Sequence, residues 1–284
     1  MPAHDDLGTR MKEFYEQVPK TKLMRRTPVI IRIDGKAFHT FTRGFKRPFD
    51  EILIKTMQET TKYLCENIQG CVLGYTQSDE ITLVLVDYKK LNSAAWFDYE
   101  VQKMCSIAAS MATMAFNKIF ERQATEWIDD YNERWNVSND DTRYRDVLRN
   151  AISKGAMFDA RVFNIPKEEV TNCLYWRQVD ATRNSIQMLG QAHFSHKELQ
   201  HKTNNDVQDM LMLQKGINWN DLPTHQKRGS CVIKMYQVAE GSWSSHAEDC
   251  LMEGGRTEWE IDTEIPIFKG ENRSYIDDLV IFGE

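Results

Sequence analysis

Two aspartates at predicted chain reversals are the residues of this 284-residue sequence best suited to metal-assisted chemistry. Asp34 ends an apolar run and is followed by Gly35, and Asp79 and Glu80 close a short polar stretch between two β-rich runs. Hard cations such as Mg²⁺ prefer oxygen ligands and usually bind one or two carboxylates plus substrate phosphates. Paired ions about 3.5–4 Å apart serve nucleotidyl transfer. The two aspartates therefore predict a site for phosphate chemistry, provided that the fold brings them together.

A strand and a hairpin are the elements that must position these carboxylates. Residues 27–34 alternate as a strand, which places Arg32 and Asp34 on one face. Residues 71–75 and 81–86, joined by polar residues 76–80, predict a hairpin with Asp79 and Glu80 at its tip. If the first strand of this hairpin pairs beside residues 27–34, Asp34 and Asp79 meet at one edge of the sheet.

The neighbouring residues suit a nucleoside triphosphate. Gly35 has no Cβ, so its own carbonyl and a triphosphate could come close. Lys36, Lys46 and Arg47 could neutralise phosphate oxygens. The residues alone leave a plainer interpretation open, in which Asp34 is a surface residue after a strand and Asp79-Glu80 an ordinary turn.

The remaining patterns predict an α+β fold. Apolar spacing indicates a helix over 50–68 with Gly70 as its C-cap. It also indicates a long helix through residues 97–115. The charged, Trp- and Tyr-containing residues 121–150 are interpreted as a helical extension of it, which ends in the loop at 138–141. Residues 156–165 and 230–238 are β-like. Ser195 to Glu198 forms a capping box, and a helix over 206–215 ends at Gly216.

Several function classes are excluded or disfavoured. The sequence contains no G-x-x-x-x-G-K-[ST], G-x-G-x-x-G or G-x-S-x-G motif. His193, His196 and His201 are spaced like metal ligands, but His196 begins a capped helix, which favours surface histidines. No apolar run reaches the length of a membrane span and the N-terminus has no apolar signal region, so we expect a soluble, cytoplasmic protein with no membrane partner. The six cysteines, expected to be reduced thiols, are Cys65, Cys71, Cys105, Cys173, Cys231 and Cys250.

Charge is unevenly distributed along the chain. The net charge is −6, which argues against a polyanion partner. Residues 18–47, however, hold nine Lys or Arg against Asp34 alone, whereas 236–284 hold twelve acids against three bases. The basic region favours either a polyanion partner or a solvated basic face. The residues that would bind RNA under the first interpretation are Lys20, Lys22, Arg25, Arg26, Arg43 and Lys46.

Several ordered motifs together resemble the histidine-tRNA guanylyltransferase family, enzymes that add nucleotides in the 3′-to-5′ direction. The resemblance spans about residues 7–235. Its motifs are Arg32-Ile33-Asp34-Gly35-Lys36-Ala37-Phe38-His39, Arg47-Pro48-Phe49-Asp50, Gln77-Ser78-Asp79-Glu80, Phe158-Asp159-Ala160-Arg161, Trp176-Arg177-Gln178-Val179-Asp180 and Lys227-Arg228-Gly229.

The resemblance implies a palm-like antiparallel sheet, as in polymerases and nucleotidyl cyclases, with helices packed on it and helical additions. It implies two Mg²⁺ ions held by Asp34, the carbonyl of Gly35 and Asp79, with Glu80 as a further catalytic carboxylate that a regular strand would turn away from Asp79. It also implies ATP and other nucleoside triphosphates as substrates, tRNA as partner, and a homotetramer. The nucleotide-binding positions that it implies are Lys36, Ala37, Phe38, His39, Arg47, Ser78, Asn184, Lys227 and Arg228.

One departure from the family pattern bears on the substrate. Where eukaryotic members carry Cys-His-Ile-Asn-Asn, this sequence has Ala181-Thr182-Arg183-Asn184-Ser185. Asn184 is retained and the histidine is replaced by Thr182. The chain is in this respect similar to the bacterial and archaeal members that repair truncated tRNA 5′ ends by templated addition. Addition of a single guanosine to histidine tRNA is the alternative, and a non-catalytic tRNA-binding protein is an alternative of another class.

The expected organisation is one catalytic domain over residues 1–235, with helical insertions at about 121–150 and 190–216. Residues 236–284 form an acidic C-terminal extension that we expect to pack on the same domain.

Overall fold

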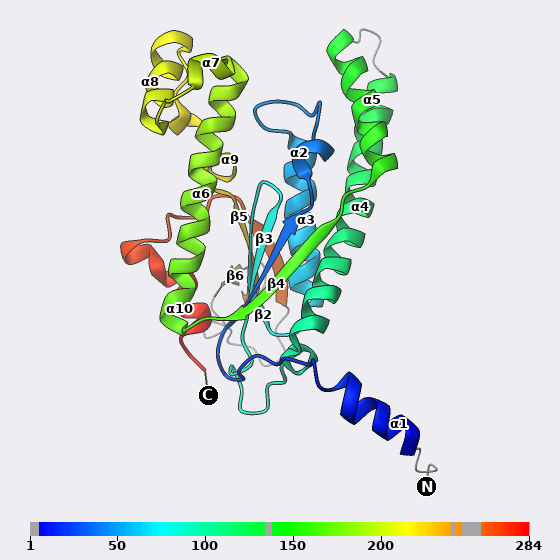
Figure 1. Ribbon diagram of the computed structural model, residues 1–284. Helices are drawn as coiled ribbons and strands as arrows, with labels where there is room; N and C mark the ends of the chain where they lie inside the picture. Colours follow the sequence, from blue (N-terminus) through cyan, green and yellow to red (C-terminus); the bar gives the residue numbers. More distant parts are fainter. Residues whose placement is uncertain (1–5, 134–137, 240–241, 246–256, 284) are drawn as a thin grey trace.

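The computed structural model describes residues 6–133, 138–239, 242–245 and 257–283 (Figure 1). Within them, one antiparallel sheet has the strand order β4-β1-β3-β2-β5-β6, and β7 also pairs with β5. The predicted α+β fold with an antiparallel sheet is therefore confirmed. The strands are β1 Val29–Gly35, β2 Cys71–Gln77, β3 Glu80–Leu85, β4 Phe158–Asn164, β5 Ser230–Ala239, β6 Ser242–Ser244 and β7 Thr257–Asp262.

Helices cover both faces of this sheet (Figure 1). The longer ones are α3 Glu51–Asn67, α4 Val101–Glu133, α5 Asn139–Lys154, α6 Lys167–His193 and α8 Asn204–Lys215. The shorter ones are α1 Asp6–Met11, α2 Phe38–Phe41, α7 His196–Leu199, α9 Thr224–Arg228 and α10 Ser274–Val280, with a π-helix at Lys12–Glu16 and 3₁₀ turns at Trp96–Tyr99, Trp219–Asp221 and Gly270–Arg273. No described helix is long and apolar enough to cross a bilayer.

The alternation of β1 distributes its side chains between two cores. Ile31 and Ile33 join the cluster under α3 and α4, whereas Ile30 packs with Val170 of α6 and Ile276 of α10 on the other face. All of these side chains are fully buried. Burying a side chain of this size contributes about 1.5–3 kcal/mol, so both cores hold β1 in register. The predicted alternation is confirmed, and it places Asp34 at the carboxyl end of a strand fixed from both sides.

The hairpin pairs differently from the expectation. Its second strand, β3, lies beside β1, with Asp34 opposite Glu80, while its first strand, β2, pairs with β5. The antiparallel direction still brings the tip of the hairpin to the carboxyl end of β1, because β3 begins where β1 ends. The backbone N–H of Gly35 donates to the carbonyl of Asp79 at 3.1 Å. The two aspartates thus meet at one edge of the sheet, as predicted, but it is the second strand of the hairpin that lies beside β1.

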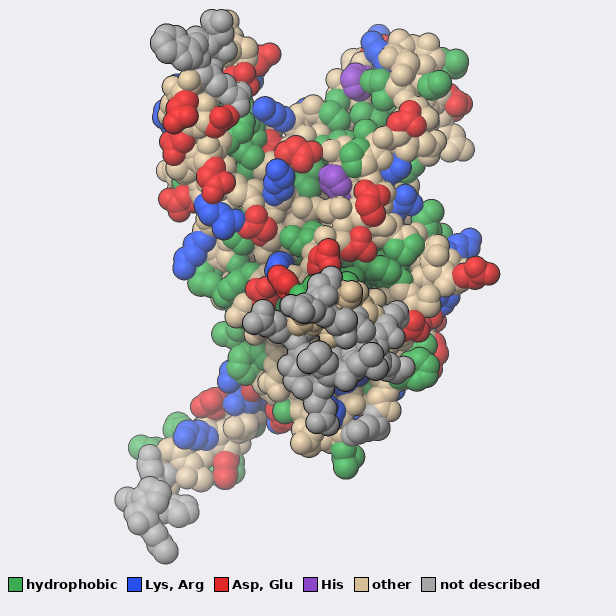
Figure 2. Space-filling view, turned by 180° about the vertical axis from the view of Figure 1, so that it is seen from behind, with side chains coloured by type: hydrophobic (Ala, Val, Ile, Leu, Met, Phe, Trp, Pro, Cys, Tyr) green, Lys and Arg blue, Asp and Glu red, His purple; other side chains and the backbone are tan. Residues whose placement is uncertain are grey.

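Two helical arms rise on either side of α2, one made of α4 and α5, the other of α6, α7 and α8 (Figure 1). The molecule is hollowed between them (Figure 2). The predicted helical extension over 121–150 is wrong in detail, since Ser138 starts α5 as its N-cap rather than ending a helix. The Ser195 capping box and the end of α8 at Gly216 are confirmed.

The C-terminal residues complete the sheet and one core. Strand β7 pairs with β5 from Cys231 to Tyr236, and Ile276 and Val280 of α10 are fully buried. The described residues of the acidic segment 236–284 therefore share the sheet of the preceding ones. Cys65, Cys71, Cys105, Cys173 and Cys231 are free thiols, and Cys250 lies outside the described residues.

Candidate active site

The carboxylates lie where β1 ends and the β2–β3 turn begins. Asp34 is half-buried on β1, and Asp79 follows Ser78, whose φ is +51°. The Ser78 hydroxyl donates to Asp79 Oδ1 at 3.1 Å. Together with the bond from Gly35 to the carbonyl of Asp79, this contact fixes the turn against the end of β1.

The electrostatics of this edge suit a cation. Burial raises the pKa of Asp79 above its usual value, and the negative charge of Asp34 raises it further against the lowering by the hydrogen bonds to the backbone and Ser78. A divalent cation beside two carboxylates relieves the repulsion between their charges. Within the described residues no group of three or more His, Cys, Asp and Glu is placed to hold a metal. The oxygen donors available at this edge are two carboxylates and the Gly35 carbonyl, the ligand type that Mg²⁺ combines with water and phosphates.

Glu80 lies beside the aspartates but contacts arginines. Its buried carboxylate accepts a hydrogen bond from Arg177 Nη2 at 2.8 Å, and Arg177 Nε and Arg32 Nε lie 2.6 and 3.5 Å from its Oε1. Burial raises the pKa of Glu80, and the two guanidiniums oppose that shift. In this position Glu80 is engaged by cations of the chain itself.

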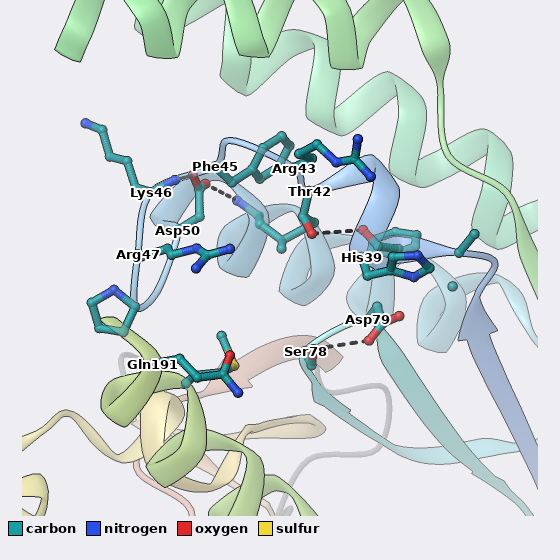
Figure 3. A pocket seen from close by; sticks show the side chains of 16 residues that line it. His39, Thr42, Arg43, Phe45, Lys46, Arg47, Asp50, Ser78, Asp79 and Gln191 are labelled. Atoms are coloured by element: carbon teal, nitrogen blue, oxygen red, sulfur yellow. Dashed lines mark hydrogen bonds between the residues drawn. The ribbon is translucent and has the colours of Figure 1, made fainter. Parts of the chain in front are cut away.

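A cavity of about 640 Å³ opens beside Asp79, between the α2–α3 segment and α6 (Figure 3). The predicted nucleotide-binding residues Ala37, Phe38, His39, Arg47 and Ser78 line it. Arg43 and Lys46, predicted to bind RNA, also border it. The cavity is also lined by residues that were not predicted from the sequence as site residues, namely Thr42, Phe45, Pro48, Asp50, Leu53, Met188 and Gln191.

The far wall of the cavity comes from α6. Met188 and Gln191 lie more than one hundred residues after the turn at Asp79, and both are exposed. Asn184 is exposed one helical turn before Met188, on the same side of α6, because residues four apart share a face. No local sequence signal marks Met188 or Gln191, which could have been found only by placing α6 opposite the α2–α3 segment.

Asp50 holds that segment in place. Its buried carboxylate caps α3 by accepting from Leu53 N at 3.0 Å, and also accepts from Lys46 N at 3.0 Å and from the Tyr144 hydroxyl at 2.7 Å. The sequence predicted a helix over 50–68 that begins at this aspartate, and an aspartate at a helix start is the signal for such a cap. Asp50 therefore joins the wall of the cavity to α5.

Asp50→Ala is expected to lower the free energy of unfolding by about 2–4 kcal/mol, because it removes a cap and leaves the buried Tyr144 hydroxyl without its acceptor. Thr203→Ala, which removes the exposed cap of α8, is the matched control and is expected to cost about 1 kcal/mol. Urea unfolding of both variants measures the difference. Equal losses would contradict the role given to Asp50.

Lys46 turns away from the cavity. Its ammonium lies 5.0 Å from the ring centroid of Trp127 and 4.6 Å from that of Tyr144 (Figure 3). Such cation–π contacts tie a lysine to an aromatic surface. The backbone of Lys46 thus helps to form the cavity while its charge is directed to the arm of α4 and α5.

The basic residues at the start of the chain lie at the other end of β1. Arg25 Nε donates to the buried Asp87 at 2.6 Å, and the backbone N–H of Arg26 donates to the same carboxylate at 2.8 Å. Lys22 pairs with Asp98, and Lys20 lies 3.6 Å from Glu16. The structure does not bring these four residues together with the aspartates.

Lys227 and Arg228 end helix α9, directly before strand β5. The Lys227 ammonium donates to the carbonyl of Asn220 at 2.6 Å, and the carbonyl of Arg228 accepts from the Tyr75 hydroxyl at 2.7 Å. Among the described side chains, Arg228 Nε is buried without a hydrogen-bond partner. Lys36 is exposed beyond Gly35, outside the lining of the cavity.

Comparisons with known proteins agree with this geometry. The family model for tRNAHis guanylyltransferase (Thg1) matches residues 8–166. An uncharacterized protein of Acanthamoeba polyphaga mimivirus, R259, is 30% identical over 81% of this chain and 78% of its own length. A tRNA(His) guanylyltransferase of Debaryomyces hansenii is 24% identical over 75% of this chain and 76% of its own.

Solved structures match almost the whole chain. A bacterial tRNA(His) guanylyltransferase (Thg1)-like protein in complex with ATP is 39% identical, with a TM-score of 0.75 over 96% of this chain and 98% of that protein. The same kind of bacterial protein in complex with GTP is 36% identical, with a TM-score of 0.73 over 98% of this chain and 100% of that one. The palm-like fold implied by the resemblance is thereby confirmed. The chain belongs to the tRNA(His) guanylyltransferase family and is a nucleotidyltransferase.

Proposed function

We propose that this enzyme is a template-dependent 3′-5′ nucleotidyltransferase that extends truncated tRNA 5′ ends. A 5′-monophosphate first attacks the α-phosphate of ATP, which gives an adenylylated end and releases pyrophosphate. The 3′-hydroxyl of an incoming nucleoside triphosphate then attacks the activated 5′ phosphate and releases AMP. Both steps are phosphoryl transfers, which depend on positioning and charge neutralisation.

One observation carries the proposal, namely a cavity of about 640 Å³ that opens directly against the turn bearing Asp79. Its size suits a nucleotide. The bacterial relatives that match this chain over almost its full length were solved with ATP and with GTP. Their nucleotides support, for this chain, a triphosphate in the cavity.

Asp34, Asp79 and the carbonyl of Gly35 are the proposed ligands of two Mg²⁺ ions. When bound, Mg²⁺ would neutralise phosphate charge and lower the pKa of the attacking hydroxyl. The chain contributes the geometry, since the bond from Gly35 N to Asp79 fixes the distance between the two strand ends. Glu80 lies outside this ligand set in the proposal.

The cavity residues have distinct proposed roles. Arg47 and His39, which line the cavity, are proposed to donate to triphosphate oxygens. Ser78 also lines the cavity and holds Asp79. Phe38 is buried, and its ring packs directly against Gly35. Asn184, on the α6 wall, and the basic Lys36, Lys227 and Arg228 around the site are proposed to meet the second nucleotide or the RNA phosphate.

An extension assay tests the function. A tRNA transcript that lacks its first nucleotide and bears a 5′-monophosphate is incubated with Mg²⁺, ATP and each nucleoside triphosphate in turn. We expect addition only of the nucleotide complementary to the opposing acceptor base. Guanosine addition restricted to histidine tRNA, regardless of the opposing base, would instead support the alternative named above. Salt-dependent tRNA binding without any consumption of ATP would support a non-catalytic binder and overturn the proposal.

We expect a homotetramer, which the family resemblance implies, and the cytoplasmic location predicted from the sequence. Light scattering of the purified protein checks the first, and a mass other than that of four chains would contradict it.

A further inference from the structure

A buried ion pair links α6 to the turn that bears Asp79. Arg177 is 5% exposed and Glu80 is 5% exposed. Arg177 Nη2 donates to Glu80 Oε2 at 2.8 Å, and Arg177 Nε lies 2.6 Å from Oε1 as an ion pair, although Nε and Oε1 have no hydrogen-bond partner among the described residues. Arg177 Nη2 also donates to Asp180 at 2.9 Å, which holds the guanidinium on its own helix. Hydrogen bonds between two charged groups are about twice as strong as those between neutral groups.

The pair connects the two walls of the site. Glu80 is the first residue of β3, directly after Asp79 and opposite Asp34. Arg177 precedes Met188 on the same continuous helix by eleven residues, or about 16 Å of rise. A helix transmits a displacement at Arg177 to Met188 and Gln191, because it is rigid over this length. The distance between the carboxylate turn and the α6 wall is therefore set where Arg177 meets Glu80.

The pair also decides which carboxylates are available to a cation. Among the described residues, no cationic side chain forms a hydrogen bond or ion pair with Asp34 or Asp79, whereas Arg177 pairs with Glu80 and Arg32 Nε lies 3.5 Å from Glu80 Oε1. A carboxylate whose charge is already compensated by two guanidiniums gains less from a divalent cation than the two aspartates do.

We infer that Arg177 is a positioning residue, which acts through Glu80 to fix the separation of the carboxylate turn from α6, and that Glu80 is held by arginines rather than serving as a metal ligand. The catalytic readouts of this inference rest on the proposed function. Arg177 and Glu80 depend on each other because both charges are buried. Removing one of them leaves the other as a buried charge without an opposite charge beside it.

Three variants test the positioning role of Arg177. Arg177→Met is expected to raise the KM for the nucleoside triphosphate about tenfold or more, with a smaller change in kcat, because the α6 wall is displaced while the aspartates remain. The double variant Glu80→Gln/Arg177→Met is expected to recover most of this loss, because neither buried group is then an unpaired charge. Arg273→Met is the matched control, since Arg273 also binds α6, at Asn172 and Glu168 far from the site, and its KM is expected to be unchanged.

Metal binding separates the roles of Glu80 and Asp79 without any turnover. Free Mn²⁺, measured by electron paramagnetic resonance, is titrated with the wild type, Glu80→Gln and Asp79→Asn. We expect Glu80→Gln to keep the wild-type affinity within about threefold and Asp79→Asn to lose about tenfold or more. Equal losses in these two variants, or a double variant no better than Arg177→Met, would overturn the inference. A wild type that binds Mn²⁺ but adds no nucleotide would refute the proposed function alone, because the Mn²⁺ comparison of Glu80→Gln with Asp79→Asn needs no turnover and still tests the role of Glu80.

Discussion

Asp79→Asn is expected to lower the rates of both 5′ adenylylation and nucleotide addition by about 100-fold or more, since one lost metal ligand should cost several kcal/mol of barrier. Asparagine keeps the size of the side chain and can still accept from the Ser78 hydroxyl. The turn should therefore remain in place, and single-turnover assays of each step measure the effect. A residual rate above about a tenth of the wild type would refute the role of Asp79, because the activation free energy would then have risen by less than about 1.4 kcal/mol.

The same variant is expected to unfold at the wild-type temperature or slightly above it. Burial and the charge of Asp34 raise the pKa of Asp79, so the ionised carboxylate is less favourable in the folded than in the unfolded chain. The stabilising contribution of Asp79 is present in its protonated form at low pH and is lost as pH rises through the folded-state pKa. A neutral asparagine avoids this loss at neutral pH. Asp209→Asn, on the exposed surface of α8, is the control and should change neither activity nor stability.

Local patterns were sufficient for the end of β1 and the hairpin tip. Alternation over residues 29–34 identified the strand and its two faces, and the polar break before Asp79 identified the turn. The pairing order was not available from those patterns, because either strand of a hairpin can lie beside a third strand. The antiparallel direction made the position of Asp79 insensitive to that error.

Long-range contacts were beyond the sequence patterns. Met188 and Gln191 lie on an ordinary helix, and only the packing of α6 across the cavity gives them a role. The pairing of Glu80 with Arg177 spans 97 positions of the chain. A count of basic residues was equally uninformative about their partners, since Arg25 is bound to the buried Asp87 and lies at the opposite end of β1 from Asp34.

Gly35→Ala is expected to reduce activity by tenfold or more and to lower the free energy of unfolding by about 2–3 kcal/mol, because the added methyl group overpacks a filled site. A Cβ at Gly35 would lie 2.2 Å from Cδ2 and 2.5 Å from Cε2 of Phe38. The Phe38 ring cannot move away, since the rings of Phe41 and Phe158 lie 5.2 Å from it, centroid to centroid. The end of β1 must move instead, and with it Asp34 and the carbonyl of Gly35.

Gly74→Ala is the matched control for this prediction. Its Cβ would lie 2.5 Å from Cys65 Sγ and 2.7 Å from Thr61 Cγ2, a similar overlap on β2 against α3, away from the cavity. We expect it to lose comparable stability while keeping its activity per folded molecule. Phe38→Leu should restore part of the activity of Gly35→Ala, because the smaller side chain makes room for the methyl group and lets β1 return. Activity and urea unfolding of the two single variants and the double variant measure the coupling, and strict additivity would show that the contact with Phe38 is not the cause.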